Sequence, residues 1–379
     1  MNIFTTFSVW VLPLLMVLFS ATAGGKKNSS IRGIIALMAL LLASFFAAAR
    51  FQIGDDWRGY ELYYESINID IGLIESYIGN TLMLQFEPGY YFVSYLTKSL
   101  GATYSAVNAI SVASLFFTII FLIKKISIPP YFIILIFLGL PLVSLFYNQV
   151  RQSFAIAFVL LAVLSRKDRS FIVFSFLALS FQFSTVIFII LAFMARHYES
   201  ISLKFFRFAL IFIPISAAIF AAGVVDSYSL IKLALPDSLA FKVDIYKEED
   251  TSLGTFRLGT VAYVIFLATY LSIKLRKNYF VTTLESRIIT TSLLSTLLIP
   301  YSLLAFPNSY AFYGRALVFA LILLSISGAI LHKYIIQNSQ NIRDLLPIYG
   351  AAALSVIYYF LTLYLYSEVF FPYNSIFFL

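Results

Sequence analysis

The sequence predicts an all-α polytopic membrane protein that crosses the bilayer about twelve times. Hydrophobic residues make up 61% of the 379 residues, charged residues make up only 12%, and the mean hydropathy is +0.92. A soluble domain contains about 25% charged residues, so this chain has too few charges to cover a water-facing surface. Its apolar runs are continuous rather than alternating, which favours helices over a β-barrel because lipid leaves each spanning segment to satisfy its own backbone groups.

The expected spans form one integral membrane domain over residues 1–379, with the first run kept as a helix because it lacks the basic start and cleavage site of a signal peptide. We expect the spans near 3–23, 33–50, 103–123, 131–148, 152–165, 171–181, 184–195, 207–223, 258–273, 288–306, 316–332 and 345–366.

The run 171–195 is ambiguous, because it is either one long span or two short helices that meet at Gln182. Lysines and arginines decide between the two, since they favour cytoplasmic loops. With the split, seventeen of the 26 basic residues lie inside; with a single span the two sides are equal, at 13 each. The split therefore predicts that both termini lie outside the cytoplasm, which in a bacterium means the periplasm. Its two longer periplasmic loops lie near 51–102 and 224–257, and their aromatic content indicates order.

Several chemistries are disfavoured by composition. The chain has no cysteine, and its two histidines, His197 and His332, lie at expected cytoplasmic ends, so we expect no metal site and no histidine triad. No glycine-rich phosphate loop with a lysine occurs, which argues against a built-in NTPase, and we expect no cofactor. The net charge of +8 sits in short clusters between spans, which indicates membrane topology rather than nucleic-acid binding.

Arginine is the first candidate site residue. Four arginines lie at the outer ends of spans, and the guanidinium fork suits phosphate and carboxylate. A polyanionic headgroup such as a lipid pyrophosphate would explain them; alternatively each pairs with an acid or reaches lipid phosphates. These four are Arg50, Arg151, Arg257 and Arg315.

Two outer carboxylates, Asp56 and Glu87, are candidates for a general base that acts on a sugar hydroxyl. The alternative for either is an ion pair with a neighbouring arginine or a helix N-cap. Tyrosines crowd the same loop, including Tyr60 and Tyr64, and aromatic rings can stack on sugars while their hydroxyls hydrogen-bond.

The order of these motifs resembles the EpsG branch of the Wzy-type polysaccharide polymerases. The matching elements are Gly54-Asp55-Asp56-Trp57-Arg58-Gly59-Tyr60 with Tyr64, then Glu87-Pro88, then Arg151-Gln152-Ser153-Phe154-Ala155. The span layout resembles that family to about residue 200, and beyond it only the general pattern does. One departure is Gln182, where the family commonly has histidine, so this chain uses another base or none.

The resemblance implies a GT-C-like glycosyltransferase that joins O-antigen or capsule repeat units at the periplasmic face. Donor and acceptor would both be glycans on undecaprenyl pyrophosphate, and a separate chain-length regulator would act with the enzyme and the membrane lipids. Asp56, Glu87 and Arg151 are the predicted catalytic residues. The predicted substrate-binding residues are Arg50, Arg58, Tyr60, Tyr64, Gln152, Arg257, Tyr313 and Arg315.

Three other functions stay open. An O-antigen ligase would use the same lipid donor, but a histidine is expected in its large outer loop and none occurs here. A flippase or transporter for lipid-linked sugar would carry charges at mid-depth, whereas here they gather at the outer face. A lipid-binding scaffold would place the outer arginines against annular lipid.

Overall fold

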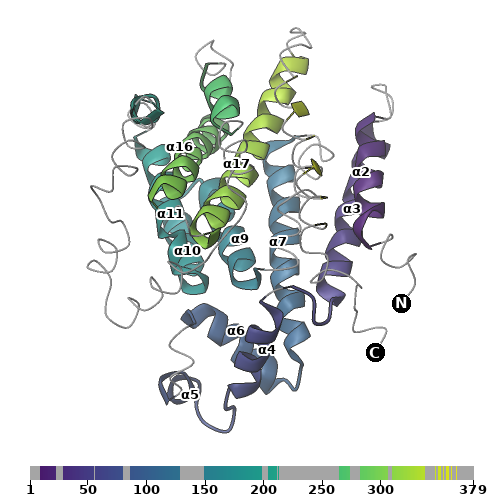
Figure 1. Cartoon of the computed structure of the whole chain (residues 1–379), viewed down its shortest axis with the longest axis vertical. Helices are drawn as coiled ribbons and strands as arrows, with labels where there is room; N and C mark the ends of the chain where they lie inside the picture. Colours follow the sequence, from purple (N-terminus) through teal and green to yellow (C-terminus); the bar gives the residue numbers. More distant parts are fainter. Residues whose placement is uncertain are drawn as a thin grey trace. The chain divides into compact units, whose positions relative to one another are not determined.

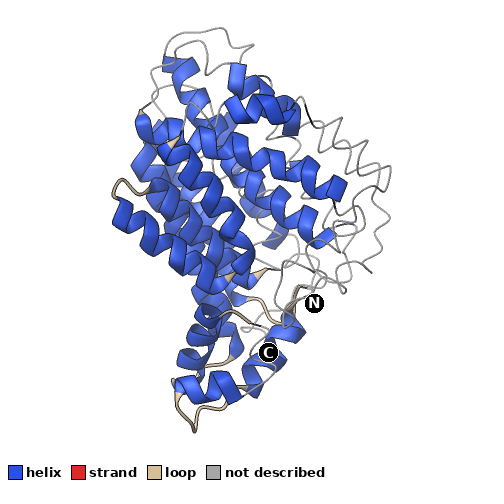
Figure 2. Cartoon of the chain, turned by 90° about the vertical axis from the view of Figure 1, so that its left-hand side faces the viewer, coloured by secondary structure: helices blue, strands red, loops and turns tan. Residues whose placement is uncertain are grey.

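The computed structural model describes most of the chain, and every regular element among these residues is a helix (Figure 2). This confirms the all-α prediction. The described residues are 9–22, 29–54, 56–79, 86–128, 149–198, 204–210, 212, 264–273, 282–305, 310–337 and isolated positions between 346 and 364.

The chain divides into two compact units, Met1–Ile189 with Tyr349–Leu379, and Ile190–Ile348. The prediction that residues 1–379 form a single membrane domain depends on how these two units assemble, and it stays a prediction. The first unit contains, in order, α2 (Leu12–Thr22), α3 (Ser29–Ala49), α4 (Trp57–Ser66), α5 (Leu73–Gly79), α6 (Pro88–Ser99), α7 (Tyr104–Ile126), α9 (Val150–Leu164) and α10 (Asp168–Phe181) (Figure 1). Helix α11 (Val186–His197) runs from the first unit into the second, which contains α16 (Thr283–Ala305) and α17 (Tyr310–Gln337).

Three described helices are long and apolar enough to cross a bilayer, over Ser30–Ala49, Tyr104–Ile126 and Ala316–Ile335. Shorter apolar helices cover Val150–Leu164, Phe183–His197 and Val264–Ile273. The number of twelve spans stays a prediction. The predicted span 131–148 lies outside the described residues, as do most of 207–223 and of 345–366 and parts of 3–23 and 258–273. The predicted loop 224–257 lies wholly outside them.

The predicted break within 171–195 is present. Helix α10 ends at Phe181, Gln182 is extended with φ −156° and ψ 107°, and a short 3₁₀ turn over Phe183–Thr185 leads into α11. Thr185 secures this turn, because its hydroxyl and its backbone N–H both donate to the Gln182 carbonyl, at 2.6 and 3.1 Å.

Helices of the first unit pack in chain order, with α3 against α7, α7 against α9, and α9 against α10. Few charges enter these contacts, and short polar side chains connect the helices instead. Asn108 of α7 donates to the Ala47 carbonyl of α3 at 2.9 Å, and the Ser111 hydroxyl donates to the Val150 carbonyl of α9 at 3.0 Å. Such bonds are typical of helix contacts in apolar surroundings.

The described part of the predicted outer loop 51–102 forms three helices, α4 to α6. Their tyrosines face inward and form a core with the starts of α7 and α9. Lys98 of α6 holds the end of α4, because its Nζ donates to the carbonyls of Tyr64, Glu65 and Ile67 at 3.2, 2.6 and 2.8 Å. An ammonium group at a helix C-terminus is favourable, so Lys98 has a structural role at the end of α4.

In the second unit, α16 and α17 pack against each other, and a buried carboxylate secures their contact. Glu285 accepts hydrogen bonds from the N–H and hydroxyl of Thr282, from the Tyr334 hydroxyl at 2.7 Å and from Lys333 at 3.2 Å. This network is satisfied within the fold, so we assign it a structural role.

Candidate functional site

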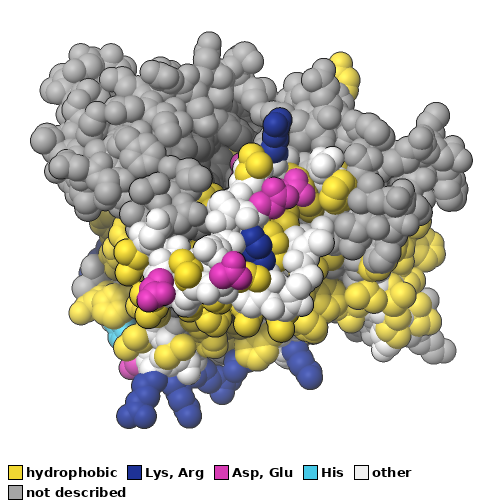
Figure 3. Space-filling model, turned by 90° about the horizontal axis from the view of Figure 1, so that it is seen from below, with side chains coloured by type: hydrophobic (Ala, Val, Ile, Leu, Met, Phe, Trp, Pro, Cys, Tyr) yellow, Lys and Arg dark blue, Asp and Glu magenta, His cyan; other side chains and the backbone are white. Residues whose placement is uncertain are grey.

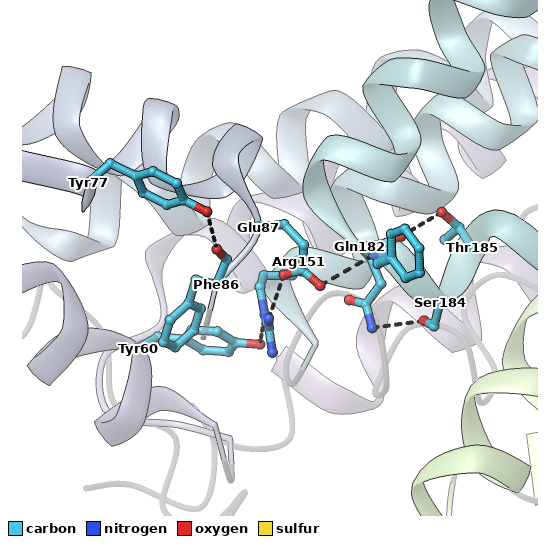
Figure 4. A network of polar contacts seen from close by, with 9 residues as sticks. Tyr60, Tyr77, Phe86, Glu87, Arg151, Gln182, Ser184 and Thr185 are labelled. Atoms are coloured by element: carbon cyan, nitrogen blue, oxygen red, sulfur yellow. Dashed lines mark hydrogen bonds and ion pairs between the residues drawn. The ribbon is translucent and has the colours of Figure 1, made fainter. Parts of the chain in front are cut away.

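Three predicted residues from distant parts of the sequence meet in the first unit. Arg151 lies in the first turn of α9, Glu87 directly precedes α6, and Tyr60 lies within α4 (Figure 4). The side chains of Arg151 and Glu87 keep 18% and 17% of their surface exposed, so the pair is accessible yet shielded on most sides.

The Glu87-Pro88-Gly89 sequence explains the position of the carboxylate. Proline holds the residue before it extended, and Glu87 has φ −70° and ψ 146°. Proline also suits the first position of a helix, so α6 begins at Pro88. Gly89 then lies against Ser180 of α10, where a Cβ atom would come within 2.7 Å of the Ser180 carbonyl oxygen. Only glycine permits this approach.

Arg151 is held in one orientation by three neighbours (Figure 4). Its Nε donates to the Tyr60 hydroxyl at 3.0 Å, and its Nη1 donates to Glu87 Oε2 at 2.7 Å. The guanidinium carbon also lies 4.7 Å from the ring centroid of Phe86, within the range of a cation–π contact. A guanidinium has five N–H donors, and the described residues use one at Nε and one at Nη1. The rest, including both on Nη2, are available to a ligand as far as the described chain shows.

Glu87 makes a second contact that the sequence did not indicate. Its Oε1 accepts a hydrogen bond from the backbone N–H of Phe183 at 3.3 Å. The extended Gln182 interrupts the helix there, so this N–H has no helical carbonyl to bond, and Glu87 supplies the acceptor. For Glu87, the sequence left open an ion pair with an arginine or a helix N-cap as alternatives to a general base. The ion pair is present, and its arginine is Arg151.

The tyrosines of this region are packed rather than displayed. Tyr60, Tyr63, Tyr64 and Tyr90 have between 0% and 6% of their surface exposed. The rings of Tyr60 and Tyr63 contact those of Tyr90 and Phe86, and the ring of Tyr64 contacts that of Tyr104. Burial raises the pKa of the Tyr63 and Tyr90 phenols well above the ordinary value of 10.0, so both stay protonated at neutral pH. Their rings lack the open faces that sugar stacking requires. Sugar binding by Tyr60 and Tyr64 stays a prediction, and the geometry favours support of Arg151 by Tyr60.

Other predicted residues of the first unit separate into buried and exposed groups. Arg50 is buried, and its guanidinium carbon lies 5.6 Å from the Trp57 ring centroid. Gln152 is buried in α9. The Tyr64 hydroxyl donates to the Ala102 carbonyl at 2.6 Å. Asp56 and Arg58 are exposed at the start of α4. On the face of the molecule seen in Figure 3, charged side chains of both signs lie among polar and apolar ones. The Tyr60 N–H bonds to the Asp56 carbonyl, so the two residues lie one helical turn apart.

Three predicted residues are not placed at this site. Arg257 lies outside the described residues, and Tyr313 and Arg315 lie in α17 of the second unit with undescribed side chains. The prediction that Arg257 and Arg315 join Arg151 stays a prediction. No group of three or more His, Cys, Asp or Glu side chains that could hold a metal occurs in the described part of the chain.

Sequence reasoning missed three contributors: Phe86, Gly89 and the Phe183 backbone N–H. Phe86 and Gly89 flank the Glu87-Pro88 pair, so they could have been found by extending the motif by one residue on each side. The N–H of Phe183 had no side-chain signal at all, because it is free for Glu87 only through the break at Gln182.

Comparison with known proteins identifies the family of this chain. The model of the EpsG family matches residues 33–375, nearly the whole chain, and so includes all three motifs of the site. Searches of curated proteins and of solved structures gave no significant match. With its apolar helices and this family match, the chain is a membrane protein that belongs to the EpsG family, a family of Wzy-like polysaccharide polymerases.

Proposed function

We propose that this protein joins undecaprenyl-pyrophosphate-linked repeat units of O-antigen or capsule at the periplasmic face of the bacterial inner membrane, in a GT-C-like fold with about twelve spans. The observation that carries this proposal is Arg151, whose guanidinium is fixed by Tyr60 and Glu87 while Nη2 bonds to none of the described residues. Such a preoriented fork at the end of an apolar helix suits the phosphates of a lipid headgroup.

Helix polarity supports the periplasmic assignment. Arg151 lies at the first turn of α9, whereas the exposed cluster Arg166, Lys167 and Arg169 follows the end of the same helix. Lys124 and Lys125 end α7, whose start packs near the start of α9 through Ser111. Basic clusters favour the cytoplasm, so the opposite end with Arg151 faces outward.

In the proposed reaction, an acceptor hydroxyl oxygen attacks the anomeric carbon of the donor glycan. The bond from that carbon to the phosphate oxygen breaks, undecaprenyl pyrophosphate leaves with the electron pair, and the hydroxyl proton passes to a base. Arg151 stabilises the charge that develops on the leaving oxygen. Asp56 is our candidate for the base, because it is exposed at the start of α4, one helical turn before Tyr60. The activated donor supplies the energy, so no nucleotide is required.

The test is elongation by purified protein in liposomes with one lipid-linked repeat unit, without nucleotide or added metal. We expect a ladder of lengthening glycans with the wild type and none with Arg151→Ala. The matched control is Arg169→Ala, which removes an exposed arginine at the opposite end of the helical layer and should leave the ladder intact.

A ladder from Arg151→Ala equal to that of the wild type would refute the role of Arg151. Wild-type protein that moves lipid-linked sugar across the bilayer without lengthening it would support the flippase instead. Transfer of glycan to a lipid A core acceptor, with no polymer formed, would support the ligase.

A further inference from the structure

We propose that Glu87 is a positioning residue, which holds Arg151 ready for an anionic headgroup and anchors it to the break between α10 and α11. This inference rests on the proposed function and assigns the carboxylate a role other than general base. It is carried by three contacts, which join Glu87 to Arg151, to Phe183 and, through Gly89, to Ser180.

The first step concerns the two carboxylate oxygens. Oε2 bonds to Arg151 Nη1 at 2.7 Å and Oε1 bonds to the Phe183 N–H at 3.3 Å, so the two oxygens face different partners. A general base needs an oxygen directed at the acceptor hydroxyl, within hydrogen-bond reach. Here each oxygen is directed at a protein donor that would be left without its acceptor if Glu87 turned away.

The second step concerns what Arg151 gains. An arginine side chain has many rotamers, and ordering it on ligand binding costs free energy. Glu87 and Tyr60 fix two nitrogens and Phe86 supports the guanidinium face, so this cost is met during folding. Among the residues that the structure describes, none bonds to Nη2, so this nitrogen can meet the ligand and gives phosphate a defined direction of approach. Glu87 also offsets the charge of Arg151 when no ligand is bound.

The third step concerns the break at Gln182. Because Glu87 accepts the Phe183 N–H, the same carboxylate stabilises the first turn after α10 and the arginine of α9. The contact of Gly89 with Ser180 keeps the start of α6 against the end of α10. This one packing contact therefore sets the distances from the Glu87 carboxylate to Arg151 and to the Phe183 N–H. The start of α6, the first turn of α9 and the 3₁₀ turn therefore form one unit around Glu87.

The experiment measures binding of undecaprenyl pyrophosphate and elongation kinetics for the wild type, Glu87→Ala, Glu87→Gln and Arg151→Ala, and for the double variant Glu87→Ala with Arg151→Ala. For Glu87→Ala we expect Kd and the donor KM to rise about tenfold, the effect of losing roughly 1.4 kcal/mol, with kcat at saturating donor changed little. Glu87→Gln keeps an acceptor oxygen and should recover part of the binding. Once Arg151 is alanine, removing Glu87 should weaken binding no further.

Three outcomes would overturn the inference. One is a large loss of kcat in Glu87→Ala with unchanged Kd, which is the behaviour of a base. The second is a Glu87→Ala effect on Kd that persists in full without Arg151. The third is a folded Glu87→Gln variant that binds no better than Glu87→Ala. Failure of the wild type to bind undecaprenyl pyrophosphate or to elongate glycan would refute the proposed function itself.

Discussion

Replacing Gly89 by alanine tests the packing contact that places Glu87. The added Cβ would lie 2.5 Å from the Ser180 hydroxyl oxygen, 2.7 Å from its carbonyl oxygen and 2.9 Å from its carbonyl carbon. The hydroxyl can rotate, but the backbone cannot, so α6 must move away from α10 by roughly 1 Å to reach ordinary contact distance. Overpacking of this kind costs about 1–3 kcal/mol, and the higher helix propensity of alanine returns at most about 1 kcal/mol.

The functional consequence follows from the ion pair. Glu87 is two residues from Gly89, and a displacement of roughly 1 Å would lengthen its 2.7 Å contact with Arg151 beyond a good hydrogen bond. We therefore expect Gly89→Ala to lower both the thermal unfolding midpoint in detergent and the rate of glycan elongation. The fall in rate should come from a higher donor KM, as for Glu87→Ala.

Gly59→Ala is the matched control, because a Cβ at this position in α4 meets nothing within 4 Å. Its unfolding midpoint should equal or exceed that of the wild type, since alanine favours helix over glycine by about 1 kcal/mol. Its elongation rate should be unchanged. Equal behaviour of the two variants in both assays would refute the reasoning from the contact between Gly89 and Ser180.

Two further substitutions test neighbouring contacts. Tyr60→Phe keeps the buried ring but removes the hydroxyl that accepts a hydrogen bond from Arg151 Nε. The donor KM should rise by about threefold to tenfold, in line with a lost hydrogen bond of about 1 kcal/mol, while the unfolding midpoint changes little. An unchanged KM would show that Tyr60 does not orient the arginine. Lys98→Met keeps much of the apolar stem but removes three hydrogen bonds from the end of α4. Amide hydrogen exchange in α4 should therefore become faster, while exchange in α7 stays unchanged. Equal exchange rates in α4 of the wild type and the variant would show that Lys98 does not stabilise the end of this helix.

The helices that the sequence predicted best are those with long apolar runs. The expected spans 33–50 and 103–123 correspond to α3 and α7 within a few residues, because continuous apolar sequence has few other structures available in lipid. The break at Gln182 was predicted from the distribution of charges alone, and α10 ends one residue before it. The helices of the loop 51–102 were not located individually, because their burial depends on tyrosines that contact residues distant in the sequence.

The candidate site was predicted as a set of residue types rather than as an arrangement. Arg151, Glu87 and Tyr60 were each named, yet nothing in their spacing indicated that Glu87 and Tyr60 would bond to the same guanidinium. Arg50 was predicted to bind substrate, and this stays a prediction; in the structure it is buried, with its guanidinium near the Trp57 ring. Which neighbours an arginine meets is decided by three-dimensional packing.

By itself, the sequence determined that this chain is helical, that it enters a membrane and that its motifs match a polymerase family. These properties follow from local composition and from the order of short motifs, which need no knowledge of distant contacts. Only the tertiary structure decided that Glu87 pairs with Arg151 and accepts from Phe183. The physical reason is that the contact of Gly89 with Ser180 and the starts of α6 and α9 bring together residues 64 and 96 positions apart, and that proximity exists only once the helices have packed.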